Sequence, residues 1–390
     1  MIPVREAIIL AGGFGTRLAH VVPDVCKPMA PVADRPFLRF LLDQLSSARF
    51  SRVVIADGYR REQIENFFGS SYRGVEIVYS AEDLPLLTGG AVKQALEKCS
   101  SYWVYVLNGD TWLDIDFDAM ESTAFASRPE VESIIAVKNM TNADRYGTVG
   151  LDEEGTLTAF YEKQPRLEGF INAGVYLLRR DCLDGMPVKF SLESDYFESV
   201  VSEGALRSVV CEGDFIDIGV PDDYCRAQSM LAPLARNWKL AMFDRDGTIN
   251  VDTGHLHEFE KLELVSSTIE IMRHYSEDPD YKIVVVTNQA GIAKGLYDVE
   301  DMTSLHRAMT EKLFSLGVCV DAWYYCPHHP DYTGRCSCRK PEPGLLLDAM
   351  KDFDAIPENC IMYGDSASDE LAAINAGVRF VRVNGAYRKN

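Results

Sequence analysis

Two segments that lie far apart in the chain each look like the first strand of an α/β domain. Ala7–Leu10 is a short apolar run that is broken by the turn residues 11–15, AGGFG. Leu240–Phe243 is a second such run, and it is broken by residues 244–248, DRDGT. In α/β proteins a buried strand of this kind runs into a tight turn where ligands bind. Two such beginnings predict two domains.

The rest of the chain also favours two α/β domains. A length of 390 residues is large for one hydrophobic core. Apolar runs alternate with amphipathic stretches, which predicts mostly parallel sheets covered by helices. These runs are 52–56, 104–107, 133–137, 282–286 and 360–363. Because 222–235 is predicted to be helical and 236–239 to be a short joint, the predicted domains are 1–235 and 239–390.

The charge of the chain limits its partners. The formal net charge is −20, whereas nucleic acids and anionic membranes require a basic surface. We therefore expect small-molecule substrates and no nucleic-acid or membrane partner. No apolar run is long enough to cross a bilayer, and residues 1–13 lack the layout of a signal peptide. These features predict a cytoplasmic protein.

Three of the ten cysteines crowd into one short segment with two histidines. Cys326, Cys336 and Cys338 supply three thiolates, and His328 or His329 supplies an imidazole. Three sulfurs and one nitrogen are the ligand set of a closed, tetrahedral zinc site, which holds a loop and does no chemistry. Exposed free thiols are the weaker interpretation, because three reactive cysteines on one loop would invite oxidation.

The glycine-rich turn after the first strand is a candidate anion site. Gly12, Gly13 and Gly15 allow backbone N–H groups to approach a ligand closely. Thr16 and Arg17 follow at a predicted helix N-terminus, where N–H groups and the helix dipole favour an anion. Such a turn by itself is as often a plain turn as a phosphate site, so its assignment depends on other residues.

Three further residues strengthen that assignment. Lys27 supplies a second cation shortly after the loop. Asp110 closes the segment 106–110, VLNGD, and Asp217 lies in the apolar run 215–219. Either carboxylate can hold Mg²⁺. Taken singly, each acid is more often the cap of a loop or helix.

Together these residues resemble the sugar-nucleotide pyrophosphorylase family over about residues 5–230. The resemblance implies a Rossmann-like domain with a mixed sheet. It also implies a reaction in which a sugar 1-phosphate attacks the α-phosphorus of a nucleoside triphosphate and pyrophosphate leaves, which requires charge neutralisation and alignment. The matching segments, in the family's order, are LAGGFGTRL at 10–18, KPM at 27–29, LNGD at 107–110, YGTV at 146–149, EK at 162–163, NAGVY at 172–176 and DIG at 217–219.

The resemblance implies a role for each residue of this constellation. Arg17 and the glycine amides next to Thr16 would hold the triphosphate. Lys27 would bridge the reacting phosphates, and Asp110 and Asp217 would hold Mg²⁺. The residues implied to bind the sugar 1-phosphate are Gly147, Glu162, Lys163 and Asn172.

One segment departs from the family pattern. The family commonly has Gly-Thr-Gly-Gly after a Pro-Leu pair, whereas residues 85–90 here are PLLTGG, with Leu87 in place of the first glycine. This turn, which includes Gly89, usually approaches the nucleotide base. Leu87 is strained if the turn requires a positive φ at that position, but we expect the turn to tolerate the side chain.

The turn that follows the apolar run Leu240–Phe243 carries acids suited to phosphoryl transfer. Asp244 can act as the nucleophile toward phosphorus, and Asp246 as the acid for the leaving alkoxide and then as the base for water. Thr287 ends a later apolar run and supplies a hydroxyl for the phosphoryl group, while Lys340 supplies a cation. Asp365, in the segment 364–369, adds a carboxylate with which Asp244 and Asp246 can hold Mg²⁺.

These pieces, in this order, resemble the haloacid dehalogenase superfamily of phosphatases. About residues 239–385 resemble its zinc-containing heptose bisphosphate phosphatases, and histidinol-phosphate phosphatases share much of the pattern. The resemblance implies a second Rossmann-like domain with a zinc loop. The matching segments are NVDTGHLHE at 250–258, TNQAGIAKG at 287–295, YYCPHHP at 324–330 and CSCRKP at 336–341.

The phosphatase resemblance adds detail to the second site. It favours His328 over His329 as the fourth zinc ligand. It places Asn288 in the substrate site and gives Arg339 a contact with the substrate beyond the transferred group. Two histidines on the loop after the nucleophile, His255 and His257, are either packing residues or substrate contacts. Residue 366 is serine, where family members often have lysine.

The two resemblances together imply consecutive reactions. The second domain would remove the 7-phosphate of D-glycero-D-manno-heptose 1,7-bisphosphate. The first, which most resembles the D-glycero-α-D-manno-heptose 1-phosphate guanylyltransferases, would transfer GMP from GTP to the resulting heptose 1-phosphate. Mg²⁺ would serve both domains and Zn²⁺ the second.

Two alternatives remain at this point. One is a mannose- or glucose-1-phosphate nucleotidyltransferase fused to a phosphatase for another small phosphate, such as histidinol phosphate. The other is a catalytically inactive, ligand-sensing subunit, and the complete set of charged residues in the first domain argues against it.

Overall fold

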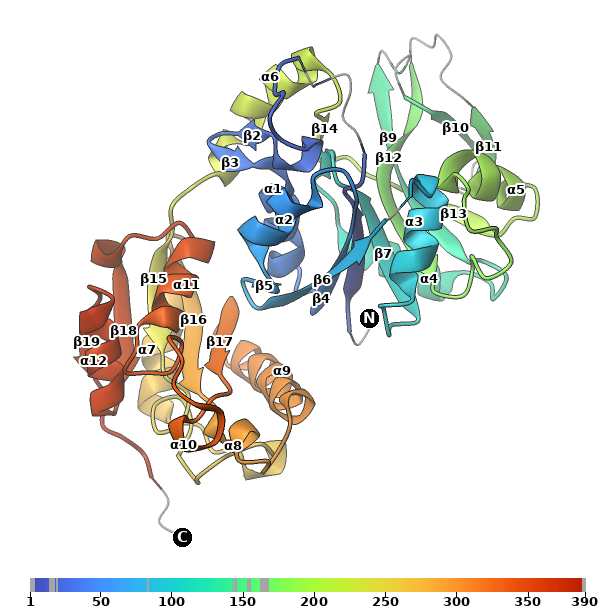
Figure 1. Ribbon diagram of the computed structural model, residues 1–390. Coiled ribbons are helices and arrows are strands. Elements are labelled where there is room, and N and C mark those ends of the chain that lie inside the picture. The colour runs from blue at the N-terminus through green and yellow to red at the C-terminus, as the bar shows by residue number, and fades with distance from the viewer. Residues whose placement is uncertain are drawn as a thin grey trace. The chain divides into compact units, whose positions relative to one another are not determined.

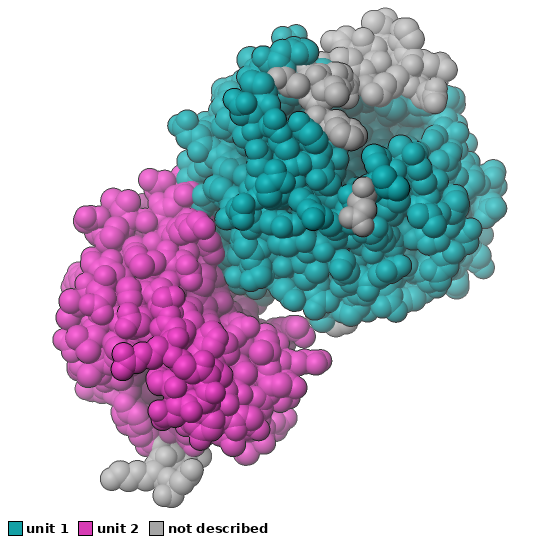
Figure 2. All heavy atoms as spheres, in the orientation of Figure 1, with its two compact units in different colours: residues 1–235 teal, residues 236–390 magenta. Residues whose placement is uncertain are grey.

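The chain folds into two α/β units. The structure is a computed structural model that describes residues 4–13, 18, 20–82, 84–141, 143, 146–152, 156–161 and 168–387. The compact units are residues 1–235 and 236–390 (Figures 1 and 2). Within the described ranges, none of the helices combines the length and the apolar character that crossing a membrane requires.

The first unit is built on a ten-stranded mixed sheet. Its central strands β7, β1, β4 and β6 are parallel, and β12 continues the sheet antiparallel to β7 (Figure 1). The strands in chain order are β1 (Glu6–Leu10), β4 (Arg52–Asp57), β5 (Ser71–Tyr72), β6 (Val75–Ala81), β7 (Trp103–Asn108), β9 (Ser133–Thr141), β10 (Thr148–Leu151), β11 (Leu157–Tyr161), β12 (Glu168–Arg179) and β13 (Leu206–Val210).

Helices cover both faces of this sheet. Successive residues of β1 point to opposite faces, so Ala7 and Ile9 join one core cluster and Ile8 joins the other. The first cluster contains side chains of α1 (Phe37–Ser47), α2 (Arg61–Phe68) and α4 (Phe117–Ala126), and the second those of α3 (Leu87–Leu96) and α5 (Glu198–Val201). A β1 strand that is apolar on both faces is therefore what a covered, parallel sheet requires.

Smaller elements complete the first unit. Two short ribbons pair β2 (Pro31–Val32) with β3 (Arg35–Pro36), and β8 (Thr111–Leu113) with β14 (Phe215–Asp217). The last helix, α6 (Pro221–Met230), is followed by a 3₁₀ turn at Ala232–Leu234. The predicted single helix over 222–235 is thus divided, because Pro233 has no N–H with which to continue an α-helix.

The second unit is a five-stranded parallel sheet in the order β17-β16-β15-β18-β19 (Figure 1). One core cluster contains side chains of α7 and α9, and the other those of α11 and α12. The elements are β15 (Lys239–Phe243), α7 (Ser266–Glu277), β16 (Tyr281–Asn288), α8 (Ala290–Ala293), α9 (Val299–Ser315), β17 (Ala322–Cys326), α10 (Pro330–Thr333), α11 (Gly344–Asp352), β18 (Cys360–Gly364), α12 (Ala367–Asn375) and β19 (Arg379–Arg382).

The topology explains where the functional side chains gather. β15 lies between β16 and β18, so the residues that follow or end these three strands meet at one edge of the sheet. Asp244, Thr287 and Asp365 occupy such positions. The predicted fold class is confirmed: a mixed sheet in the first unit and a Rossmann-like parallel sheet in the second.

Candidate functional site

In the first unit, Lys27 lies between two carboxylates. Its Nζ contacts Asp110 directly and is 3.5 Å from Oδ1 of Asp217. Asp110 follows β7, whereas Asp217 ends β14. The two meet because β14 pairs with β8 in a register that sets Asp217 opposite Thr111. The structure therefore brings together three predicted residues that are separated by up to 190 positions in the chain.

The charges of this cluster suit a divalent cation. Burial raises the pKa of Asp217, and repulsion from Asp110 raises it further, while Lys27 opposes both effects. Two carboxylates that repel each other at a partly buried position are a fitting ligand set for Mg²⁺. Gly219 belongs to the same cluster, because its N–H donates to Asp217 at 2.7 Å and an added Cβ would lie 2.8 Å from that carboxylate.

The predicted sugar residues fall partly within the described chain. The side-chain amide of Asn172 donates to Tyr176 at 2.9 Å and accepts from the Gly174 N–H at 3.0 Å, and its backbone N–H donates to the Gly147 carbonyl at 3.1 Å. Asn172 and Gly147 are thus neighbours, as a shared pocket requires. The predicted residues Gly15, Thr16, Arg17, Glu162 and Lys163 lie outside the described residues.

The two described glycines of the first turn have different surroundings. An added Cβ at Gly12 would lie 2.6 Å from the Glu82 carboxylate, whereas one at Gly13 would have no described residue within 4 Å. Glu82 is itself fixed, because it accepts a hydrogen bond from the Leu86 N–H at 2.9 Å. A side chain at Gly12 would therefore displace Glu82, whereas one at Gly13 would meet none of the described residues.

The turn at residues 85–90, which was expected to approach the nucleotide base, contains a strained residue. Leu87 begins α3 with a φ of +64°, a left-handed conformation that disfavours residues with a Cβ, and its side chain is 51% exposed. Gly89 packs against Phe190, and its N–H donates to the Phe190 carbonyl at 3.0 Å. The backbone donor of Gly89, predicted to lie near the base, is thus already used inside the protein.

Replacing Leu87 with glycine is expected to raise the free energy of unfolding of the first unit by about 1 kcal/mol, because glycine adopts the left-handed conformation without strain. Chemical denaturation measures the change. The same replacement at Val188, which is also exposed and has no positive φ, should give no such gain. A Leu87→Gly variant no more stable than the parent chain would mean that the turn carries no strain.

In the second unit, Lys340 joins two of three neighbouring carboxylates. Its Nζ is 2.5 Å from Asp244 and 2.6 Å from Asp369, and it also donates to the Val286 carbonyl at 2.7 Å. One carboxylate oxygen of each of Asp244, Asp365 and Asp369 lies within 4.8 Å of the others, close enough to share a metal ion. Asp369 was not among the metal ligands that the sequence singled out.

Burial and pairing set the protonation of this cluster. Burial raises the pKa of Asp244 to about 7 against the opposing charge of Lys340, with Asp369 and Asp246 adding repulsion. Burial alone would lower the pKa of Lys340, but its two carboxylate partners overcome this and raise it. A buried lysine that stays charged provides the positive potential that a phosphoryl group requires.

The carboxylate of Asp246 lies apart from that metal group. It accepts hydrogen bonds from Asn250 at 3.1 Å and from Gln289 at 3.0 Å, and it pairs with Arg245 at 2.8 Å. Arg245 is fully buried and also contacts His306 at 3.1 Å. The predicted Mg²⁺ ligation by the Asp246 side chain stays a prediction that these contacts do not favour, whereas a fixed acid–base position fits them.

Two predicted substrate residues also hold other parts of the site. Asn288 forms two hydrogen bonds with the backbone of Lys340. Its side-chain amide donates to the Lys340 carbonyl and accepts from the Lys340 N–H, each at 3.0 Å. Arg339 donates to the His328 carbonyl at 3.1 Å. Thr287, buried at the end of β16, accepts a hydrogen bond from Gln289 at 2.8 Å. Asn288 thus fixes the position of Lys340.

The loop histidines have separate surroundings. His257 stacks on Tyr297 with ring centroids 5.0 Å apart, which is packing. His255 has a φ of +61°, and its Nε2 lies 3.3 Å from Nζ of Lys294. Burial, together with Lys294, lowers the pKa of His255. Residue 366, where a lysine is common, caps α12 through its hydroxyl.

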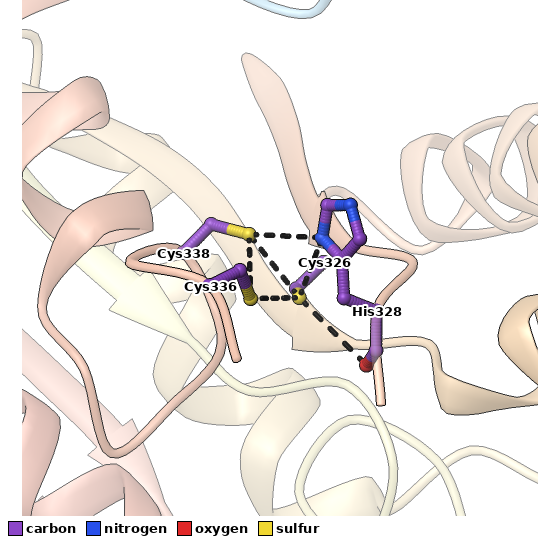
Figure 3. A group of neighbouring side chains, drawn as sticks. All are labelled: Cys326, His328, Cys336 and Cys338. Atoms are coloured by element: carbon purple, nitrogen blue, oxygen red, sulfur yellow. Dashed lines mark hydrogen bonds between the residues drawn. The ribbon is translucent and has the colours of Figure 1, made fainter. Parts of the chain in front are cut away.

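Three sulfurs and one imidazole converge beside this site (Figure 3). The Sγ atoms of Cys326, Cys336 and Cys338 lie 3.2–3.6 Å apart, and His328 Nδ1 is 3.4 Å from Cys338 and 3.7 Å from Cys326. Ligand atoms that lie about 2.0–2.3 Å from a zinc ion, at the corners of a tetrahedron, are separated from one another by similar distances. His329 caps α10 instead. The cluster could bind zinc.

The comparisons with known proteins divide the chain in the same way. Residues 6–233 match the Nucleotidyl transferase family, and residues 337–390 match the HAD-hydrolase-like family. A D-glycero-alpha-D-manno-heptose 1-phosphate guanylyltransferase of Campylobacter jejuni is 40% identical over 221 residues, which are 56% of this chain and 96% of that protein. The crystal structure of HddC from Yersinia pseudotuberculosis covers 58% of this chain and 100% of its own, with 30% identity and a TM-score of 0.54.

The second unit has relatives of its own. A D-glycero-beta-D-manno-heptose-1,7-bisphosphate 7-phosphatase of Photorhabdus laumondii is 42% identical over 140 residues, which are 35% of this chain and 74% of that protein. The chain is therefore a fusion that belongs to the nucleotidyl transferase family through its first unit and to the HAD-type heptose-bisphosphate phosphatases through its second.

Proposed function

We propose that the chain catalyses two steps of GDP-heptose synthesis. The second unit removes the 7-phosphate of D-glycero-D-manno-heptose 1,7-bisphosphate, and the first transfers GMP from GTP to the heptose 1-phosphate with release of pyrophosphate. One observation carries this proposal: each unit holds its own cluster of carboxylates around a lysine, at Lys27 and at Lys340. The activities of the relatives named above supply the substrates.

In the phosphatase reaction, Asp244 attacks the 7-phosphorus and becomes an aspartyl phosphate. Lys340 and the Thr287 hydroxyl stabilise the phosphoryl charge, and Asp246 protonates the leaving sugar oxygen and then takes a proton from the attacking water. Asp244, Asp365 and Asp369 would hold Mg²⁺, which neutralises charge on the phosphoryl oxygens.

In the transferase reaction, the 1-phosphate oxygen attacks the α-phosphorus directly, with no covalent enzyme intermediate. In this proposal Lys27 bridges the two anions, and Arg17 with the glycine turn binds the triphosphate. Asp110 and Asp217 would hold Mg²⁺ and thereby lose their mutual repulsion. GTP as a substrate, and thiolates that must stay reduced, both suit a cytoplasmic enzyme.

The Cys326–His328–Cys336–Cys338 cluster binds structural zinc in this proposal. Replacing Cys338 with serine is expected to lower the free energy of unfolding of the second unit by about 3 kcal/mol, because the loop that carries Arg339 and Lys340 loses its cross-link. Zinc content should fall from about one ion per chain. Cys319→Ser, at an exposed cysteine outside the cluster, should change neither quantity. Full zinc content in Cys338→Ser would remove this assignment.

Product analysis on a panel of substrates tests the proposed function. The full chain should release phosphate from heptose 1,7-bisphosphate faster than from histidinol phosphate. It should release pyrophosphate from GTP with heptose 1-phosphate faster than with mannose or glucose 1-phosphate. Equal or better use of a hexose 1-phosphate or of histidinol phosphate would instead favour the alternative specificity of that unit.

A further inference from the structure

The segment after β19 returns across the phosphatase site. The N–H of Val383 donates to the Gly364 carbonyl at 3.0 Å, and the N–H of Ala386 donates to the Gly247 carbonyl at 3.0 Å. The Asp252 N–H in turn donates to the Ala386 carbonyl at 2.8 Å. Residues 383–387, here called the tail segment, are thereby tied to the end of β18, to the turn after Asp246 and to the following loop.

The tail segment carries a hydroxyl to a carboxylate of the metal group. Tyr387 donates its phenolic hydrogen to Oδ2 of Asp365, and Thr248 donates to Oδ1 of the same residue at 3.2 Å. Each oxygen of this carboxylate therefore has a donor from a different part of the chain. The other two acids of the metal group contact Lys340, and Asp369 also accepts from the Ser366 hydroxyl at 2.6 Å.

Glycines make room for this contact. An added Cβ at Gly385 would lie 2.8 Å from Oδ2 of Asp365 and would also collide with the Tyr387 ring. At Gly247, where φ is +86°, an added Cβ would lie 2.5 Å from the same oxygen. The close approach of the tail segment to Asp365 thus depends on two residues without side chains.

The tyrosine is suited to be a permanent donor. A phenol keeps its proton at neutral pH, so the Tyr387 hydroxyl can donate to Asp365. The residue is 61% exposed, so packing does little to hold it in place. The hydroxyl is therefore the main connection between this side chain and the site.

We propose that Tyr387 is a positioning residue for the divalent cation of the phosphatase site: its hydroxyl holds Asp365 in the orientation that binds the metal. This inference rests on the proposed function, which places Mg²⁺ at Asp244, Asp365 and Asp369. Groups that orient a metal ligand from behind commonly change metal affinity about 10–100-fold when removed. A carboxylate freed of this donor must be ordered by the metal itself, and that lowers affinity.

The test compares Tyr387→Phe with Tyr332→Phe in the full chain. Tyr332 is also 61% exposed, lies in the same unit and does not contact the metal group, so it is a matched control. Both are made in an Asp110→Ala background, which disrupts the metal site of the first unit. Calorimetric titration with MgCl₂, without substrate, gives the dissociation constant. An Asp365→Ala variant defines the signal that belongs to the phosphatase site.

We expect Tyr387→Phe to weaken the Asp365-dependent binding of Mg²⁺ by about 10-fold and Tyr332→Phe to leave it unchanged. The phosphatase kcat at saturating Mg²⁺ should stay near the parent value, because the acid–base and nucleophilic groups are untouched. An unchanged or tighter dissociation constant in folded Tyr387→Phe, or the same loss in Tyr332→Phe, would overturn the inference. A parent chain without Asp365-dependent binding would overturn the proposed metal site as well.

Discussion

Replacing Asp244 with asparagine is expected to lower phosphate release from heptose 1,7-bisphosphate by at least about 10³-fold, while pyrophosphate release from GTP and heptose 1-phosphate stays within about 2-fold of the parent value. The amide cannot form the phosphoryl-enzyme intermediate. Colorimetric phosphate release and coupled pyrophosphate release measure the two activities on the same preparation.

The asparagine variant should also fold. Burial favours the neutral form of Asp244 and raises its pKa to about 7, so we expect an uncharged amide to fit there. Lys340 keeps Asp369 as a partner at 2.6 Å, so its charge is not left unpaired. The exposed Asp348 offers a control, and Asp348→Asn should leave both activities intact. Loss of both activities in a folded Asp244→Asn variant would contradict the existence of two separate sites.

Replacing Asp110 with alanine is expected to have the reverse effect. Pyrophosphate release should fall by at least about 10³-fold, and phosphate release should not change. Asp110 contacts Lys27 and shares the cluster with Asp217, so its removal takes away half of the carboxylate pair that would hold Mg²⁺. Lys27 would then be drawn to Asp217 alone.

The pKa of Asp217 provides a second measurement for the Asp110→Ala variant. Because repulsion from Asp110 helps to raise the pKa of Asp217, the Asp110→Ala variant should lower the pKa of Asp217 toward its ordinary range. Carboxylate NMR of Asp217 reports that change. Asp114→Ala, at an exposed acid a few positions on, is the control for both readouts. A variant that retained pyrophosphate release would exclude Asp110 from the reaction.

Much of the fold follows from the sequence because its strands are buried on both faces. Runs such as 240–243 and 360–363 are apolar without alternation, which is typical of parallel strands under helices. The gathering of Asp244 with Asp365 follows from the same rule, since both come directly after or at the end of such strands. The spacing of Cys326, Cys336 and Cys338 similarly predicted the cluster that the structure contains.

Other contacts could not be predicted because tertiary packing decides them. Arg245 stands beside the nucleophile in the sequence, but its inward direction, toward His306 on α9, depends on how α9 packs against the sheet. Tyr387 reaches Asp365 because the chain turns back after β19; the dipeptide Asn384-Gly385 signals a turn but not the residue that the chain reaches after it. The contact of the Asn288 amide with the backbone of Lys340 was likewise not predicted, and substrate binding by Asn288 stays a prediction.

Strain at residue 87 was the conditional prediction that the structure could decide. The sequence showed a leucine at a position that is commonly glycine, and the strain depended on the sign of φ there. The value of +64° shows that the turn keeps the left-handed conformation despite the side chain. The remainder of α3 packs through Ala91, Val92 and Ala95, and this packing offsets the local cost.

Mixing two inactivated chains tests the central claim most directly. Heptose 1,7-bisphosphate and GTP with Mg²⁺ are incubated with Asp244→Asn, with Asp110→Ala or with both, and ³¹P NMR follows the products. We predict that Asp244→Asn alone leaves the 7-phosphate in place, that Asp110→Ala alone stops at heptose 1-phosphate and free phosphate, and that the mixture forms GDP-heptose and pyrophosphate. If each folded variant lacked both activities and the mixture remained inactive, the account of two independent phosphorus sites would be wrong.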